Sequence, residues 1–194
     1  MTSLENISPK KDALLEIAGD LFYRQGYGAT GIKQISEKAG IAKGTFYSHF
    51  ESKEAIGTAW LEKRNWQWNQ TMKEATERAS TPQAKILVLF DILEEWLKSN
   101  EYRGCAFLNS LGELPDPEAD MRVVIKNHKA GIRDHLVRLS CDHFTGKTKS
   151  YAEHKGNVIF LLFEAAIVEA QNFQDGWPVK TAKKEVRSIL KGSQ

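Results

Sequence analysis

The stretch that decides the fold is Gly26–Glu54, which reads GYGATGIKQISEKAGIAKGTFYSHFESKE. Apolar residues recur at helical spacing in two short segments, one containing Ile32 and Ile35 and the other containing Phe46. Gly40 lies between them, and glycine readily adopts the backbone conformation that ends a helix. Two short helices joined by a brief turn form the helix-turn-helix arrangement.

Helical periodicity continues on both sides of this stretch, and we find no alternating strand pattern. The sequence therefore predicts an all-α protein of about nine helices. Ser8-Pro9 is a helix start signal and Gly26 a stop signal, and Thr30 and Ser52 can cap later helices. We expect a helix-turn-helix DNA-binding domain at residues 1–53 and a helical effector-binding and dimerisation domain at 54–194. The second expected helix is capped by Thr30 and ended by Gly40. The others run over residues 9–25, 43–49, 53–78, 82–97, 104–114, 116–144, 150–174 and 179–190.

Composition describes an ordinary globular chain rather than a strongly basic nucleic-acid binder. The 194 residues are 41% hydrophobic and 27% charged, with a net charge of +2. The richest apolar run, Val158–Val168, is too short to span a bilayer, so we expect a buried helix and no membrane association. The beginning of the chain has no signal-peptide pattern and the two cysteines form no disulfide framework, so we expect a cytoplasmic protein with reduced thiols.

The second short helix of the stretch, with Phe46 in the core, leaves polar or small side chains on its outer face. Such a helix can enter a DNA major groove about 12 Å wide. Gly44 would let the backbone approach the DNA closely, and Lys53 begins the next helix, where backbone N–H groups favour phosphate. Instead of contacting DNA, Tyr47 could pack against the rest of the protein, and the exposed residues of this helix together could form a face that meets only solvent. The expected DNA contacts are Thr30, Lys33, Lys43, Gly44, Thr45, Tyr47, Ser48, His49 and Lys53.

This stretch resembles the DNA-binding domain of the TetR family of transcriptional repressors. The resemblance implies a homodimer that binds a palindromic operator in double-stranded DNA and releases it when an inducer binds the C-terminal domain. One departure is Ala42, where the family often has Ser or Thr, because alanine removes an N-cap worth about 1 kcal/mol. The matching residues are Gly26, Tyr27, Ala29, Thr30, Ile32, Ile35, Ala39, Gly40, Ile41, Lys43, Gly44, Thr45, Phe46, Tyr47, His49, Phe50, Ser52, Lys53 and Glu54.

Bulk charge does not assist DNA binding in this region, because basic and acidic residues are equal in number up to Gly57. Affinity must then come from the placement of a few cations on one face. We therefore expect Glu16, Asp20 and Glu37 to lie away from Lys43 and His49.

Cys105 is a candidate sensor of oxidants or electrophiles. It follows Arg103-Gly104 at the start of an expected helix, and a helix N-terminus and a nearby arginine both favour a thiolate. Some electrophile-sensing repressors of the TetR family resemble this segment in having a Gly-Cys pair before a short helix. The alternative is a small buried hydrophobic residue. Cys141 has no such setting.

Other residues of the second domain are candidates to line an effector pocket, namely Trp66, Trp96 and His128. His128 and His135 are seven residues apart, whereas helix-borne metal ligands favour a spacing of four, so we expect no metal and no cofactor.

The last two expected helices carry more apolar residues than one core can absorb. We expect them to form an isologous dimer interface, with a fully buried intramolecular helix as the alternative. The expected interface residues are Ile159, Leu162, Ala166, Val186, Ile189 and Leu190.

These features favour a DNA-binding regulator, most simply a repressor released by an inducer or by modification of Cys105. No nucleophile–base pair or carboxylate pair supports catalysis, so we do not expect an enzyme. The competing hypothesis is a helical small-molecule-binding protein or enzyme with a non-functional helix-turn-helix. Gly26–Gly31 also matches G-x-G-x-x-G, but nucleotide binding needs a preceding strand, which the sequence does not predict.

Overall fold

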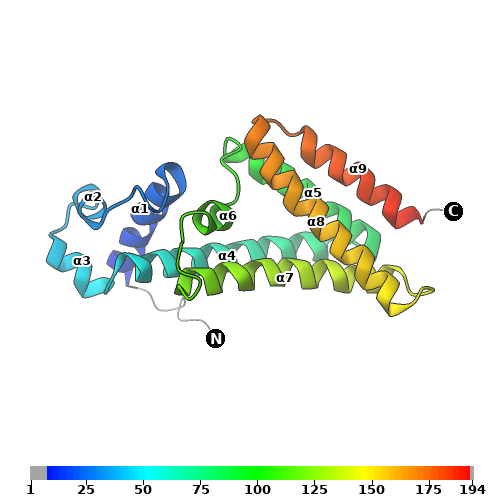
Figure 1. Ribbon diagram of the computed structural model, residues 1–194, viewed down its shortest axis with the longest axis horizontal. Coiled ribbons are helices and arrows are strands. Elements are labelled where there is room, and N and C mark those ends of the chain that lie inside the picture. The colour runs from blue at the N-terminus through cyan, green and yellow to red at the C-terminus, as the bar shows by residue number, and fades with distance from the viewer. Residues whose placement is uncertain (1–7, 193–194) are drawn as a thin grey trace. The chain divides into compact units, whose positions relative to one another are not determined.

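The computed structural model describes residues 8–192, and within this part of the chain the regular elements are all helices joined by short turns and loops, with no strand (Figure 1). The prediction of an all-α protein of about nine helices is confirmed. The helices are α1 (Pro9–Gln25), α2 (Ile32–Lys38), α3 (Lys43–His49), α4 (Lys53–Glu77), α5 (Pro82–Ser99), α6 (Ala106–Leu111), α7 (Asp120–His143), α8 (Lys149–Phe173) and α9 (Trp177–Lys191).

Several helices begin where a short side chain caps the first turn. The Ser8 hydroxyl accepts a hydrogen bond from the backbone N–H of Lys11, and Thr81 does the same for Ala84. Each cap is followed by a proline in the first turn, where its missing N–H costs no hydrogen bond. These local signals explain why α1 and α5 begin at the predicted residues.

The start of α7 differs from the prediction. Asp116-Pro117 was expected to open this helix, but the helix begins at Asp120. The Asp116 carboxylate instead accepts a hydrogen bond from the N–H of Glu118 at 2.9 Å, which stabilises a local turn. The predicted helix over residues 104–114 is likewise shorter and runs from Ala106 to Leu111.

The chain divides into two compact units. The first comprises Met1–Gln67 and Ala106–Asn127, and the second comprises Trp68–Cys105 and His128–Gln194. The predicted division at residue 53 stays a prediction. Fully buried side chains form a core in each unit, including Ile35, Phe46, Ile56 and Leu61 in the first and Phe90, Leu93, Leu97 and Phe163 in the second.

The second unit buries one face of α8 and α9 inside the subunit. The helix α9 packs on both α8 and α5, and Lys183 of α9 forms an ion pair with Asp91 of α5. Among the expected dimer residues, Ile159 and Val186 have no exposed surface. The prediction that these side chains form the dimer interface is therefore wrong for the four that are buried within the subunit, namely Ile159, Ala166, Val186 and Leu190.

The exposed apolar residues of α8 lie on its other face. Leu161 is 64% exposed and Val168 is 48% exposed, and Ala165 between them is also exposed. Phe173 and Trp177 lie at the turn between α8 and α9, both exposed, with ring centroids 5.3 Å apart. Within residues 8–192, no helix is both long enough and apolar enough to cross a membrane.

Candidate nucleic-acid interface

The turn before α2 is fixed by a buried threonine. The Thr30 side chain has no exposed surface, donates to the carbonyl of Gly26 at 2.7 Å and accepts from the Gln25 amide at 3.0 Å. The predictions that Thr30 caps α2 and contacts DNA are therefore wrong, because its hydroxyl is used inside the protein. The residue at the N-cap of α2 is Gly31, with no side-chain cap.

The turn between α2 and α3 contains one left-handed residue. Gly40 has φ +65°, a conformation that glycine adopts without the penalty of a Cβ atom. Ala42 then occupies the N-cap of α3 and forms no side-chain hydrogen bond, as expected for a residue without a hydroxyl. The first N–H groups of α3 are consequently left without a side-chain cap.

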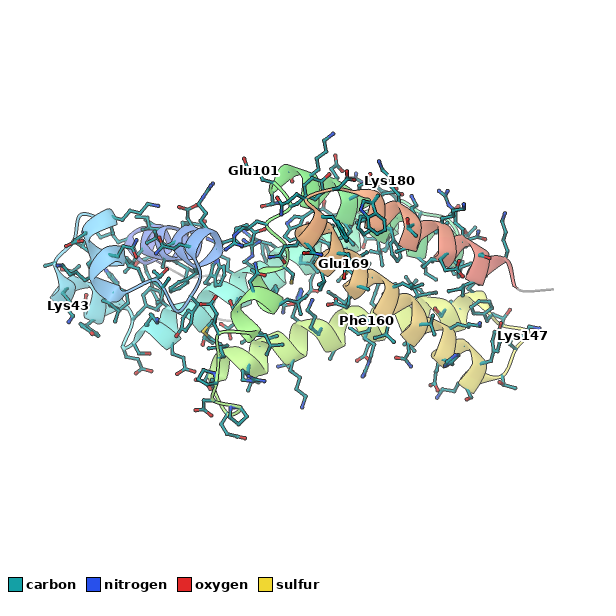
Figure 2. All side chains as sticks on the ribbon, turned by 45° about the horizontal axis from the view of Figure 1, so that its top comes forward. Lys43, Glu101, Lys147, Phe160, Glu169 and Lys180 are labelled. Atoms are coloured by element: carbon teal, nitrogen blue, oxygen red, sulfur yellow. The ribbon has the colours of Figure 1, made fainter. Side chains whose placement is uncertain are left out.

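Helix α3 has one buried side and one exposed side. Phe46 is fully buried and its ring lies 6.3 Å from that of Phe50. The opposite side is open to solvent, and Lys43 is labelled there at the start of α3 in Figure 2. The exposed residues are Lys43, Gly44, Thr45, Tyr47 and Ser48, with His49 half-buried.

Two observations show that the exposed side of α3 is not needed for packing within the subunit. Tyr47 is 46% exposed although it is aromatic, and its ring makes an edge contact with Phe46. A Cβ atom added to Gly44 would meet nothing within 4 Å, so this glycine is not required by close packing. A helix surface of this kind is free to contact a partner.

The contacts of the Lys53 side chain differ from the expectation that it binds DNA. Its ammonium donates to the carbonyl of Tyr27 at 3.1 Å and lies 4.3 Å from the centroid of the Tyr27 ring. The Lys53 side chain therefore connects the start of α4 to the turn after α1, whereas the prediction placed it on DNA. Ser52, in contrast, caps α4 as expected, accepting from the N–H of Ala55 at 2.9 Å.

The acidic residues near the helix-turn-helix are paired with cations of the same subunit. Asp20 binds Arg24 and Lys38, and hydrogen bonds from Lys38 and then Arg24 hold the pKa of the Asp20 carboxyl below its ordinary value. Glu16 lies 2.6 Å from Lys63, and Glu37 lies 3.8 Å from the expected DNA contact Lys33. The cations that these three carboxylates bind do not include Lys43 or His49, as the DNA-binding hypothesis requires.

Glu113, which the sequence did not single out, holds the glycine-rich turn after α1. Its carboxylate accepts hydrogen bonds from the backbone N–H groups of Tyr27 at 3.2 Å and Gly28 at 2.5 Å. Two amides of the G-x-G-x-x-G sequence, those of Tyr27 and Gly28, are therefore occupied by a carboxylate of the same chain. Gly26 has φ +103° here, a positive value that glycine tolerates, although its ψ of 150° is not that of a left-handed cap.

Cys105 lies in the second unit beside a lysine that the sequence did not single out. The thiol is 5% exposed, and Lys129 of α7 donates to its sulfur at 3.5 Å. The same ammonium donates to Glu164 of α8 at 2.7 Å. One signal was present in the sequence, since Glu164 is the only charge in the apolar run 158–168. The spacing of the three residues gave no sign that they meet.

The other expected effector residues, Trp66, His128 and Trp96, differ in burial and in the unit to which they belong. Trp66 belongs to the first unit and is 52% exposed, so it is not a core residue, and its place in an effector pocket stays a prediction. His128 is buried in the second unit. Trp96 of α5 contacts Trp68, whose indole N–H is buried and has no hydrogen-bond partner.

Comparison with known proteins supports a regulatory role for the N-terminal region. Residues 14–59 match the sequence model described as bacterial regulatory proteins, tetR family. Over 189 residues, which cover 93% of each chain, the sequence is 24% identical to the HTH-type transcriptional repressor NemR of Escherichia coli (strain K12). It is 34% identical to the HTH-type transcriptional repressor DhaR of Mycobacterium sp. (strain GP1) over 80 residues, covering 41% of this chain and 40% of DhaR.

Solved structures share the fold. SCO4454, a TetR-family transcriptional regulator from Streptomyces coelicolor, aligns with a TM-score of 0.86 at 22% identity and covers 94% of each chain. The reduced form of Escherichia coli NemR aligns with a TM-score of 0.78 at 22% identity, covering 93% of this chain and 96% of NemR. At this identity the similarity establishes the helical fold and its element order.

Proposed function

Because this chain is a DNA-binding transcriptional regulator of the TetR family, we propose that it is a repressor that binds a palindromic operator as a homodimer. A small-molecule inducer or the modification of Cys105 would then release it from DNA. The observation that carries the proposal is the exposed side of α3, which is polar and not needed for packing within the subunit. The acidic residues Glu16, Asp20 and Glu37 form ion pairs with cations that lie outside α3.

The proposed DNA contacts follow from the exposed groups of α2 and α3. Side chains at the start of α3 would reach base edges in the major groove, and Gly44 would allow close approach of the backbone. Lys43 would contact a phosphate as an exposed cation, and Lys33 would exchange its exposed ion pair with Glu37 for a phosphate. The side chains of Thr30 and Lys53 are not part of the proposed set, because both are bonded within the protein. The proposed set is Lys33, Lys43, Gly44, Thr45, Tyr47, Ser48 and His49.

We place the proposed dimer contact on the exposed face of α8. Leu161, Ala165 and Val168 follow one another at spacings of four and three residues, so they form one stripe along the helix. Large exposed apolar side chains on a stripe of this kind mark an interaction surface. A second copy of the chain would cover it symmetrically, since the same stripe on each subunit can pack against its mate. Leu162 and Ile189, which are partly exposed, would lie at its margin.

Release would act through α4. This helix is continuous from Lys53, directly after the helix-turn-helix, to Glu77. A ligand or a covalent change that displaced α4 would alter the spacing of the two α3 helices in a dimer, and half-sites are read only at a fixed spacing. Operator binding of this type takes place in the cytoplasm and needs no enzymatic activity, no metal and no cofactor.

Selection of duplexes from a random DNA library by the purified protein tests this function. The proposal predicts enrichment of an inverted repeat and binding that weakens as salt concentration rises. Absence of enrichment, together with salt-independent or undetectable binding, would favour the alternative of a helical small-molecule-binding protein or enzyme with a non-functional helix-turn-helix.

A further inference from the structure

We propose that Lys129 makes Cys105 reactive, so that the Cys105 site is a modification site for small, soft electrophiles. Glu164 has the role of a positioning residue, which holds the Lys129 ammonium against the sulfur. The inference deepens the proposed function by naming the chemistry of one route of release. The reactivity of the Cys105 thiol can be measured without DNA, so this proposal and the proposed repressor function can fail separately.

The first support is geometric. Three segments far apart in the chain supply the three groups: Cys105 precedes α6, Lys129 belongs to α7 and Glu164 to α8. The ammonium donates to the Glu164 carboxylate at 2.7 Å and to the Cys105 sulfur at 3.5 Å. Because the strong contact to Glu164 fixes the ammonium, the sulfur faces a cation in a defined position.

The second support is the charge of the lysine. Burial alone would lower the pKa of the Lys129 ammonium, but Cys105 and Glu164 outweigh burial and raise that pKa above its ordinary value. Lys129 therefore remains a cation at neutral pH. An adjacent cation favours the thiolate, which is the nucleophilic form of cysteine.

The third support is that the site is enclosed and incomplete. The Lys129 and Glu164 side chains are each 16% exposed and the thiol is 5% exposed, so only a small reagent can reach the sulfur. The second oxygen of Glu164, Oε1, is buried without a hydrogen-bond partner. This oxygen can accept a further hydrogen bond from a small polar molecule that enters the site.

The chemical step is a nucleophilic substitution or addition at the sulfur. With iodoacetamide as the probe, a bond forms between Cys105 Sγ and the methylene carbon, the carbon–iodine bond breaks and iodide leaves. The thiol proton passes to solvent when the thiolate forms. The product is a neutral thioether, so the Cys105 sulfur can no longer form a thiolate beside the Lys129 ammonium.

Rates of alkylation of the two cysteines in the intact protein give the first test. Cys141 is more exposed than Cys105, so exposure alone predicts that iodoacetamide modifies Cys141 first. We expect the reverse order, followed by intact mass and peptide mapping. Faster modification of Cys141 would overturn the proposal, whatever the variants described next do.

Two variants in a Cys141→Ser background separate charge from structure. Lys129→Gln keeps a donor for Glu164 but removes the cation, and we expect the second-order rate constant at Cys105 to fall about ten-fold or more at neutral pH. Lys129→Arg keeps the cation and should remain within about three-fold of the parent. Equal rates for Lys129→Gln and the parent, or equal losses in both variants, would contradict the proposal.

The consequence for DNA is measured last. If Cys105 reacts as expected but the alkylated protein binds its selected duplex unchanged, the reactivity stands and the release route by Cys105 fails. If the rate constant for alkylation of Cys105 does not depend on Lys129, the proposal that Lys129 activates the thiol fails, even when alkylation releases the protein from DNA.

Discussion

The carboxylate of Glu113 and the backbone N–H of Gly28, 85 residues apart in the chain, lie 2.5 Å apart in a hydrogen bond. The second oxygen of the same carboxylate accepts from the N–H of Tyr27. Tyr27 in turn lies beneath the ammonium of Lys53, and its ring packs 5.2 Å from that of Phe22. Glu113 thus secures the turn that connects α1 to the helix-turn-helix.

Replacing Glu113 with glutamine should loosen this turn. Glutamine offers one accepting oxygen and an NH₂ group, so at least one of the two backbone N–H groups loses its partner. We expect the free energy of unfolding to fall by about 1 kcal/mol. Urea unfolding of the variant measures it, and Glu118→Gln, an exposed residue of the same connection, is the matched control. Equal losses in both variants would show that the Glu113 contacts contribute no specific stability.

Gly44→Ala should separate stability from DNA binding. A Cβ atom has open space at Gly44 and alanine favours a helix, so stability should rise by up to about 1 kcal/mol. If the backbone at Gly44 approaches DNA closely, the same change should weaken binding to the selected duplex at least several-fold.

The control for Gly44 is Gly131→Ala, because Gly131 lies within α7 and also has open space for a Cβ atom. It should gain similar stability and leave DNA affinity unchanged. Unaltered affinity of Gly44→Ala would remove Gly44 from the interface.

Leu161→Glu should convert the proposed dimer to a monomer. A charge on the exposed stripe of α8 would be buried without a partner in the assembly, and burial of an unpaired charge is strongly unfavourable. Sedimentation or light scattering at micromolar concentration measures the mass. Val123→Glu, which alters an apolar residue of α7 that is 51% exposed, is the control. A monomeric parent protein would contradict the dimer itself.

Asp20 should contribute stability that depends on pH. Its pKa is lower in the folded protein than its ordinary value of 3.8, because Lys38 and Arg24 bind the charged form. This contribution is fully present well above pH 3.8 and is lost as pH falls through the folded pKa. Asp20→Asn should therefore be less stable than the parent at pH 7, and the difference should shrink in acid. A difference that is constant with pH would exclude this ion cluster as its source.

Helix boundaries were predictable where the signals are local. Ser8-Pro9 and Thr81-Pro82 fix the starts of α1 and α5 because a capping side chain and its target lie three residues apart. Asp116-Pro117 carries the same pattern, yet its carboxylate closes a turn instead of a helix. The pattern alone does not distinguish these two uses of an aspartate.

The candidate site was predictable only in part, because its remaining contacts join distant parts of the chain. The exposed side of α3 followed from the helical period, since Phe46 had to face the core. The bonds of Lys53 to Tyr27 and of Lys129 to Cys105 have no sequence signature. For Ile159 and Val186, the apolar pattern indicated burial. The pattern could not distinguish burial within one subunit from burial at an interface between two subunits.

The central claim is that the exposed side of α3 binds double-stranded DNA. Fluorescence anisotropy titrations of the selected duplex at several salt concentrations test it most directly, with the parent, Lys43→Met and the control Lys184→Met, an exposed lysine of α9. Loss of one phosphate contact per subunit should lower affinity and reduce the salt slope by about two for a dimer, while the control retains both. A Lys43→Met protein with the affinity and salt slope of the parent would contradict the claim.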